Sequence, residues 1–490
     1  MSAAESSDRS FQADSLALGM SVMLLMTVIQ RGIGFGRGIW FCRVLDDQVL
    51  GQWAMAFGFV TMVTPMLLLG LPGSLPRYVE TYRQRGHLRS FLGRIAWLTF
   101  ALSGAAAAGM LVFPEAFGRL VFRAPAGFSP ILALAVAVVS IVLFNSLNEL
   151  VAALRQVRVV SWMQFTQSVG FTVLAMAVLM GGGQLTGLIY SFAAACWLGS
   201  LPAWWVLLRN WHLVPRAPEP LCSGSMWQRV LPYAAALWVM NLLSNAFELS
   251  DRYMILHVSQ SADLGQSLVG QYHSARIIPA LLVSVAVMGS GVLLPYMTAD
   301  WEGGRHRQMR ASLRRVLLAV SVVFTVGAAA ALTLAPWMFE KLLGGRYEDG
   351  LAVMPLAFTF SIWAGLIALA QNYLWVAERG KLVGWALAVG LAVNLGLNAW
   401  LLPRFGLGGA VAATAFSHLV VLLGIYLAMQ HSGYRSDVTL VWVTLLPATL
   451  LAGPLAAVVC TLGVCVASPQ ARRWLHEAYR QLRTKSRLWS

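Results

Sequence analysis

The chain has 490 residues, of which 58% are hydrophobic and only 11% charged, and its mean hydropathy is +0.68. Soluble domains carry about 25% charged residues, so the composition excludes an ordinary soluble protein and predicts a chain that crosses a membrane many times. The formal net charge of +15 does not indicate a nucleic-acid partner, because the basic residues lie in short segments between apolar runs. The 5 cysteines show no metal-ligand spacing, and we predict neither a metal nor a cofactor.

The chain begins with polar and acidic residues without a signal-peptide pattern, and twelve apolar windows of about 20 residues follow before residue 431. The predicted spans are residues 15–40, 49–76, 91–113, 129–153, 161–180, 184–208, 229–257, 269–297, 313–335, 351–376, 382–402 and 409–430. A further apolar segment, residues 438–467, is interrupted by Pro447 and Gly453-Pro454. It fits either one tilted span or a hairpin of two short helices.

The basic residues are unequally divided between the two sets of loops. The loops that join even-numbered to odd-numbered spans, with the basic linker, carry seventeen of them, and the opposite loops carry six. Because basic loops stay in the cytoplasm, this asymmetry predicts a cytoplasmic N-terminus. Two of the basic loops, Tyr78–Arg89 and Ala299–Arg310, also contain aromatic or apolar residues. They fit either a helix that lies along anionic headgroups or a plain connecting loop.

The two halves of the chain resemble each other at a nearly constant offset of about 220 residues. The matching segments are Gly51–Trp53 with Gly270–Tyr272, Pro76 with Pro295, Arg158–Trp162 with Lys381–Trp385, and Gly187 with Gly409. Six spans in each half keep the two repeats in parallel orientation. We therefore predict an all-α polytopic membrane protein with two six-helix lobes around a central polar cavity, plus one or two extra C-terminal helices.

This architecture predicts three parts of the chain. Residues 1–217 form the N-terminal lobe with a basic linker, residues 218–435 form the C-terminal lobe, and residues 436–490 form an extra hydrophobic segment with a basic tail. No nucleotide-binding loop, zinc-protease motif or nucleophile elbow is present, and Gly32–Gly36 lies inside an apolar segment rather than after a strand. We therefore predict no catalytic residues and expect that the protein is not an enzyme.

The segment Trp227–His257 is apolar enough to span a bilayer, yet polar residues recur in it at steps of 4, 3 and 4. They are Asn241, Asn245, Glu248 and Arg252. This spacing puts all four on one face of a helix, and Asp251 is expected to widen the stripe. Charges at membrane depth are costly unless they face a partner or a wet cavity, so the stripe predicts one wall of the cavity.

Further polar residues within the spans complete the predicted site. The predicted substrate-binding residues are Arg31, Arg37, Asn245, Arg252 and Arg276, and the predicted ion-coupling residues are Glu149, Glu248 and Asp251. Some of these side chains also fit simpler roles, because Arg37 can extend its side chain to the headgroups and Arg252 can pair with Glu248. Buried asparagines such as Asn394 and Asn398 are expected to form hydrogen bonds between helices.

The basic residues within the spans are almost all arginine rather than lysine. A guanidinium group binds phosphate oxygens through two parallel hydrogen bonds, whereas the lysine ammonium acts as a point charge. An arginine-rich cavity therefore indicates an anionic substrate. A polyprenyl diphosphate fits this chemistry, and its sugars would bind asparagine and glutamine side chains and stack on tryptophan rings.

Several motifs carry a family resemblance that covers residues 15–430. They are Arg43–Leu45, Gly51–Trp53, Leu69–Leu71, Pro76–Tyr78, Asp251–Tyr253 and Leu402–Ala410. In these the chain resembles the bacterial O-antigen and exopolysaccharide flippases of the multidrug/oligosaccharidyl-lipid/polysaccharide exporter superfamily. The interruptions after residue 437 depart from the twelve-span pattern of that superfamily.

The resemblance implies a transporter in the bacterial cytoplasmic (inner) membrane. It would flip polyprenyl-diphosphate-linked oligosaccharides from the cytoplasmic to the outer leaflet by alternating access, for polysaccharide assembly. Its implied partners are this lipid-linked substrate, the bilayer, and a polysaccharide polymerase and co-polymerase. Two other functions remain open, an ion-coupled multidrug antiporter and a non-transporting scaffold of a polysaccharide-assembly complex.

The predicted orientation can be tested with single cysteines in a cysteine-free background. We expect Arg85→Cys, Arg216→Cys and Arg307→Cys to resist impermeant thiol reagents added to intact cells, whereas Gly345→Cys is labelled, because only the latter faces outward. Labelling would be measured by mass shift on gels. Labelling of the first three variants contradicts the orientation.

Overall fold

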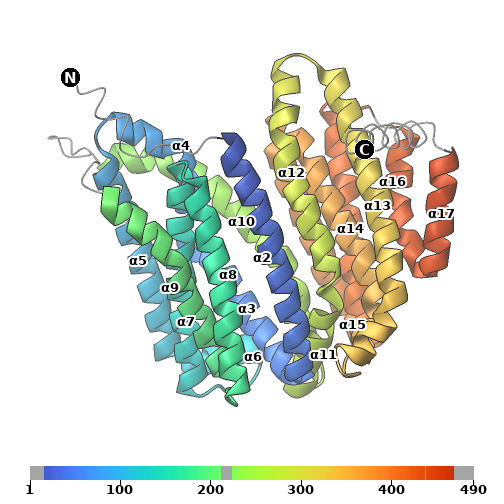
Figure 1. The fold of residues 1–490 in the computed structure, drawn as a ribbon, viewed down its shortest axis with the longest axis horizontal. Helices are drawn as coiled ribbons and strands as arrows, with labels where there is room; N and C mark the ends of the chain where they lie inside the picture. Colours follow the sequence, from blue (N-terminus) through green and yellow to red (C-terminus); the bar gives the residue numbers. More distant parts are fainter. Residues whose placement is uncertain (1–15, 211–222, 436, 468–490) are drawn as a thin grey trace, which may run out of the picture. The chain divides into compact units, whose positions relative to one another are not determined.

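The computed structural model describes residues 16–210, 223–435 and 437–467, and every element within these ranges is a helix (Figure 1). Among the described residues, 10 helices are long and apolar enough to cross a membrane. The prediction of an all-α polytopic membrane protein is therefore confirmed. The predicted boundary at residues 217 and 218, most of the basic linker and the basic tail lie outside the described residues.

The chain folds into two compact units. Unit 1 contains the residues up to Leu249 together with Ser261–Gly270, and unit 2 contains Ser250–Gln260 and the residues from Gln271 onward. The change from one unit to the other thus falls within two helices, α10 (Ser223–Val258) and α11 (Ala262–Arg276).

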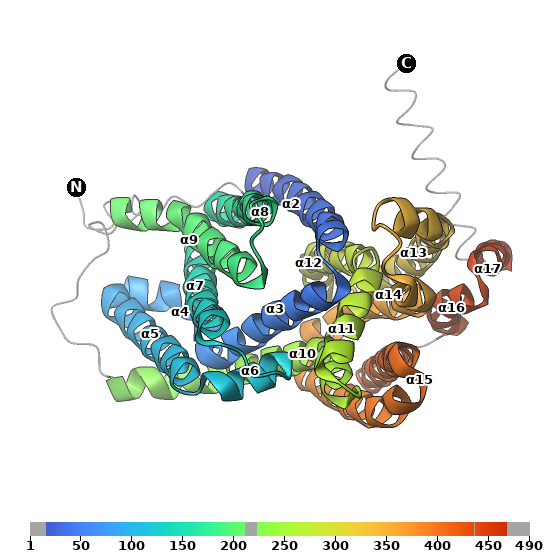
Figure 2. The same ribbon diagram turned by 90° about the horizontal axis from the view of Figure 1, so that it is seen from below.

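Unit 1 is built around one apolar helix, α7, which packs against α9, α5, α4 and α3 (Figure 2). Its mean hydropathy over the best window is 2.4, and its buried residues are mostly alanine, valine, leucine and isoleucine. Besides parts of α10 and α11, the helices are α2 (Leu16–Val44), α3 (Asp47–Leu68), α4 (Leu71–Gln84), α5 (Leu88–Val112), α6 (Pro114–Phe122), α7 (Phe128–Ala153), α8 (Val157–Met180) and α9 (Leu185–Asn210).

The predicted span 49–76 is wrong at its end, because the chain breaks there into α3 and α4. Leu69 and Gly70 both adopt left-handed backbone conformations, with φ of 48° and 69°. A Cβ on Gly70 would lie 2.1 Å from the carbonyl oxygen of Ala234, so only glycine fits this turn. Helix α4 buries Leu75, Val79 and other apolar residues on one side, which is the amphipathic pattern expected for the first basic loop.

Unit 2 continues from the ends of α10 and α11 and contains the remaining helices. They are α12 (Pro279–Glu302), α13 (His306–Lys341), α14 (Glu348–Val376), α15 (Gly380–His431), α16 (Val438–Ala448), the short 3-10 helix η2 (Thr449–Ala452) and α17 (Pro454–Ala467). The predicted eleventh and twelfth spans are two helices that share the label α15, and they are separated at Gly406, whose backbone is not helical (φ 54°, ψ −137°).

Two other expectations for unit 2 are changed by the structure. The predicted eighth span, residues 269–297, is wrong at its start, because α11 ends at Arg276 and α12 begins at Pro279, which supplies no N–H for a preceding turn. The basic loop Ala299–Arg310 forms no separate helix. It consists of the end of α12, a turn with Gly304 at φ 70°, and the start of α13.

The segment after residue 437 forms two short helices, which resolves the alternatives left open by its sequence. Figure 1 shows α16 and α17 beside α13. Pro447 has no N–H, so the carbonyl oxygen of Val443 lacks its helical donor, and Ser321 of α13 donates a hydrogen bond to it at 2.8 Å. Trp363 of α14 donates in the same way to the carbonyl oxygen of Thr444 at 2.9 Å. The break in α16 is therefore stabilised by polar side chains of its neighbours.

The repeat-related glycines Gly51 and Gly270 meet within unit 1, where α3 crosses the first part of α11. A Cβ on Gly51 would lie 1.8 Å from the carbonyl oxygen of Gln266, and a Cβ on Gly270 would lie 2.0 Å from that of Asp47. Around this crossing Gln266 accepts hydrogen bonds from Gln52 and Gln48 at 2.8 and 3.2 Å. Small residues thus allow two backbones to approach closely, with polar side chains beside them.

We predict that Gly51→Ala destabilises the protein, because its methyl group meets backbone atoms that cannot move aside. An overpacked contact of this kind costs about 1–3 kcal/mol. The matched control is Gly93→Ala in α5, where a Cβ meets nothing within 4 Å and alanine favours the helix. Thermal unfolding in detergent, followed by size-exclusion fluorescence, should show a lower midpoint for Gly51→Ala alone. Equal midpoints contradict the close crossing.

Candidate functional site

A buried carboxylate forms the centre of the polar cluster in unit 2. Asp251, at the end of α10, is only 2% exposed and accepts three hydrogen bonds from neutral side chains. Tyr272 of α11 donates its hydroxyl to Oδ2 at 2.8 Å, and Asn394 and Asn398 of α15 donate Nδ2 to Oδ1 at 2.9 and 3.1 Å. The carboxylate therefore joins three helices, and its charge is compensated by hydrogen bonds rather than exposed to water.

The two asparagines stand one helical turn apart on α15, so their side chains point to the same side. Their expected role in hydrogen bonding between helices is confirmed. Ser250 donates to Asn394 Oδ1 at 2.8 Å, and Asn398 Nδ2 lies 3.2 Å from the same oxygen. Within the described residues, Asn398 Oδ1 is buried and has no hydrogen-bond donor, which leaves one oxygen acceptor beside the carboxylate.

The expectation that Asp251 widens the exposed stripe of α10 is wrong. Neighbouring residues on a helix point about 100° apart, and this turn directs Asp251 towards α11 and α15 while Arg252 remains half-exposed. The other residues of the stripe do share one face of the continuous helix α10. Asn241 and Glu248 are exposed there, and the half-buried Asn245 donates to the carbonyl oxygen of Asn241 at 2.8 Å.

Two predicted substrate-binding arginines lie near this cluster. The guanidinium carbon of Arg276 lies 5.3 Å from the ring centre of Tyr272 and 5.6 Å from that of Phe360, within the range of cation–π interactions. Arg252 and Arg276 both interact electrostatically with His273 of α11. Tyr272 thus contacts Asp251 through its hydroxyl and Arg276 through its ring, and three predicted site residues are brought together in unit 2.

The other predicted residues lie in unit 1. Arg31 of α2 is exposed, and Glu149 of α7 is half-buried. Arg37 donates hydrogen bonds to the carbonyl oxygen of Ser168 and to Thr172 Oγ1 at 3.2 and 3.0 Å, and it lies over the ring of Phe171 at 4.5 Å. These contacts connect α2 to α8.

Sequence reasoning missed Tyr272 and Ser250 as members of the cluster. The spacing of Tyr272 and Arg276, four residues apart on α11, was available as a signal for their contact. No sequence pattern indicates that Tyr272 reaches Asp251, because the partners come from different helices and their distance depends on how the helices pack.

Apolar helices of spanning length, with a carboxylate buried and hydrogen-bonded among them, define the protein as a multi-pass membrane protein. Residues 16–300, more than half of the chain, match the family described as polysaccharide biosynthesis protein. The chain therefore belongs to the polysaccharide biosynthesis protein family.

The chain is also similar to individual proteins. The uncharacterized membrane protein YabM of Bacillus subtilis (strain 168) is 22% identical over 431 residues, which cover 84% of this chain and 80% of YabM. Among solved structures, the lipid II flippase MurJ in its inward closed conformation has a TM-score of 0.69 at 12% identity, over 94% of this chain and 99% of MurJ.

An inward-facing multidrug resistance transporter of the MATE family has a TM-score of 0.65 at 14% identity, over 85% of this chain and 99% of that protein. These likenesses establish a shared fold. The family match agrees with the resemblance to polysaccharide-biosynthesis proteins that its motifs carry.

Proposed function

We propose that this protein is a flippase that moves polyprenyl-diphosphate-linked oligosaccharides from the cytoplasmic to the outer leaflet of the bacterial inner membrane, by alternating access. The family to which it belongs is described by polysaccharide biosynthesis, and MurJ, whose fold it shares, is named as a lipid II flippase. Polysaccharide polymerase and co-polymerase are proposed as its partners, because they would act on the flipped oligosaccharide.

The observation that carries the proposal is the pair of arginines beside the Asp251 cluster. Only Lys341, Lys381 and Lys485 among the 35 basic residues are lysines, so guanidinium groups dominate the cationic chemistry of the chain. Arg252 and Arg276 are both half-exposed, and they can bind a diphosphate through paired hydrogen bonds. Arg31, Arg37 and Asn245 of unit 1 are proposed as further substrate-binding residues.

We assign ion coupling to Asp251, with Glu248 and Glu149 as further acids. The Asp251 carboxylate and Asn398 Oδ1, which receives no hydrogen bond from the described residues, are two buried acceptor groups. A proton or a small hard cation would bind to them. Binding there changes the charge next to Tyr272, and through its ring the environment of Arg276. This contact connects the proposed coupling residue to the proposed substrate residue.

The substrate assignment predicts that Arg252→Ala and Arg276→Ala abolish polysaccharide export while both variants remain in the membrane. Lysine at either position should restore export only in part, because it keeps the charge but loses the paired hydrogen bonds. Flipping of a fluorescent lipid-diphosphate sugar in proteoliposomes provides the direct measurement, and exposed Arg404→Ala is the matched control.

Full flipping by both alanine variants would remove these arginines from substrate binding. Gradient-driven efflux of cationic dyes, with no flipping by the wild-type protein, favours the multidrug antiporter. Normal polysaccharide assembly with every charge of the site neutralised favours a scaffold.

The coupling assignment predicts that Asp251→Asn removes the response of flipping to a pH or sodium gradient. If Glu248 takes part in coupling, Glu248→Gln should also remove the gradient response while the protein yield stays normal. If Glu248 serves only to pair with Arg252, the substitution should lower the yield. The control is Glu115→Gln, since Glu115 is exposed and pairs with Arg119 at 3.5 Å on the surface. A gradient response that persists in both variants excludes these two acids from coupling.

A further inference from the structure

A second cluster of arginines lies in unit 2, at the start of α13. Three of them, Arg307, Arg310 and Arg314, occur at steps of 3 and 4, which puts them on one side of this helix. With Ala311, and with Arg435 from the segment after α15, they line a cavity of about 340 Å³. Two segments more than 100 residues apart in the sequence therefore bring four guanidinium groups to one place.

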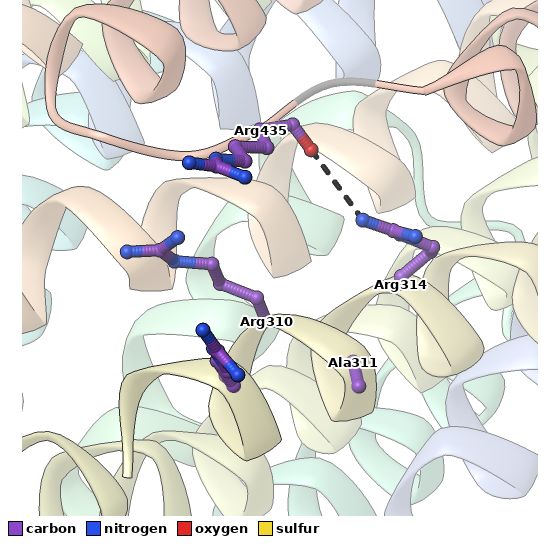
Figure 3. A pocket seen from close by; sticks show the side chains of 5 residues that line it. Arg310, Ala311, Arg314 and Arg435 are labelled. Carbon is purple, nitrogen blue, oxygen red and sulfur yellow. Dashed lines mark hydrogen bonds between the residues drawn. The ribbon is translucent and has the colours of Figure 1, made fainter. Parts of the chain in front are cut away.

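The cavity is held in shape by contacts beneath the arginines. Arg314 forms an ion pair with Asp437 and donates to the carbonyl oxygen of Arg435 at 3.4 Å, which attaches the segment after α15 to α13. Figure 3 shows Arg314 reaching that oxygen while the side chains of Arg310 and Arg435 extend to the other side.

Behind the arginines, two buried tyrosines pack edge to face. The ring centres of Tyr373 and Tyr434 lie 5.3 Å apart with an interplanar angle of 84°, and Arg310 contacts the hydroxyl of Tyr373. Burial raises the pKa of the Tyr434 phenol, against the lowering effect of Arg314, so this ring stays neutral. The two tyrosines therefore add no negative charge close to Arg310 and Arg314.

The charges of the cavity are not balanced by the described part of the chain. Asp437 pairs with Arg314, but no acidic side chain among the described residues forms an ion pair with Arg307, Arg310 or Arg435. The Nε atoms of Arg310 and Arg314 are buried without an acceptor in the same residues. The positive end of the α13 dipole adds to this charge, because the arginines lie in its first turns. An anion in the cavity would relieve the repulsion among these arginines and would accept hydrogen bonds from their N–H groups.

The length of α13 indicates where the cavity lies. This helix has 36 residues, and at 1.5 Å per residue it is about 54 Å long, well beyond the ~30 Å of a hydrocarbon core. Its apolar run begins at Val316, so the arginines lie just outside the core, at the level of lipid headgroups. Phosphate groups are the anions concentrated at that level.

We infer that this cavity, the Arg307–Arg435 cavity, binds a phosphate group at the level of the lipid headgroups, separately from the Asp251 cluster. The ligand is a phosphate mono- or diester, such as the headgroup of an anionic phospholipid, and three or four guanidinium groups would hold it. A soluble phosphate presents the same oxygens. The inference does not depend on the proposed flippase activity.

The test compares two variants of the full-length protein that lose the same charge. One carries Arg307→Gln, Arg310→Gln and Arg435→Gln, and it retains Arg314, which pairs with Asp437. The control carries Arg85→Gln, Arg155→Gln and Arg229→Gln, three exposed arginines of unit 1 that belong to the same set of basic loops. Native mass spectrometry would count phosphatidic acid bound to protein from phosphatidylcholine nanodiscs, and calorimetry would measure binding of inorganic diphosphate.

We expect the cavity variant to bind phosphatidic acid roughly tenfold more weakly than the wild type, and the control variant to change by less than about twofold. Loss of diphosphate binding as well identifies a site open to soluble phosphates, and loss of lipid binding alone identifies a headgroup site. Arg310→Lys provides a milder variant, with an intermediate loss, if the triple variant folds poorly. Equal binding by wild type and cavity variant, or equal loss in cavity and control variants, overturns the inference.

Discussion

An ionised carboxylate inside a membrane protein is tolerated only when the surrounding protein replaces its water, and unit 2 depends on such an arrangement. Asp251 is buried away from solvent, and neutral donors from α11 and α15 provide its hydrogen bonds. Removing one partner of a buried charge costs about 3–5 kcal/mol in other proteins, because the remaining group is left uncompensated. Within unit 2, this carboxylate therefore joins the last turns of α10 and α11 to α15.

The requirement also explains how interrupted helices persist in a chain this apolar. Pro447 frees a carbonyl oxygen in α16, and the side chain of Ser321 from a neighbouring helix satisfies it. Asn372 of α14 acts similarly, because it donates to the carbonyl oxygen of Ser290 in α12 at 3.0 Å. Single asparagines and serines of the spans thus form hydrogen bonds between helices, whereas several arginines cluster beside Asp251 and at the start of α13.

The internal repeat has a physical meaning in the fold. Its best-matched residues, Gly51 and Gly270, are the ones that contact each other where α3 crosses α11. Each glycine permits the approach of the segment that contains the other, so the constraint on one position is also a constraint on its repeat partner. Both repeats therefore keep a small residue at this position for the same steric reason.

The sequence by itself determined the class of the protein and the course of its helices. The membrane spans followed from the sequence because hydropathy depends on local composition. The polar stripe of α10 and the shared face of Asn394 and Asn398 followed from residue spacing within one helix. The motif Asp251–Tyr253 was one of several that indicated the polysaccharide biosynthesis family, and the family match confirmed it.

Only the tertiary structure decided which of these residues meet. Asp251 and Arg252 are adjacent in the chain, yet the first is buried against α15 and the second is half-exposed, because the packing of α10 selects which side is covered. The break between α3 and α4 and the hairpin of α16 and α17 depend on contacts with Ala234 and Ser321, which lie far away in the sequence. Arg435 joins the arginines of α13 only through the turn that follows α15. Such contacts reflect the packing of whole helices, which no local pattern specifies.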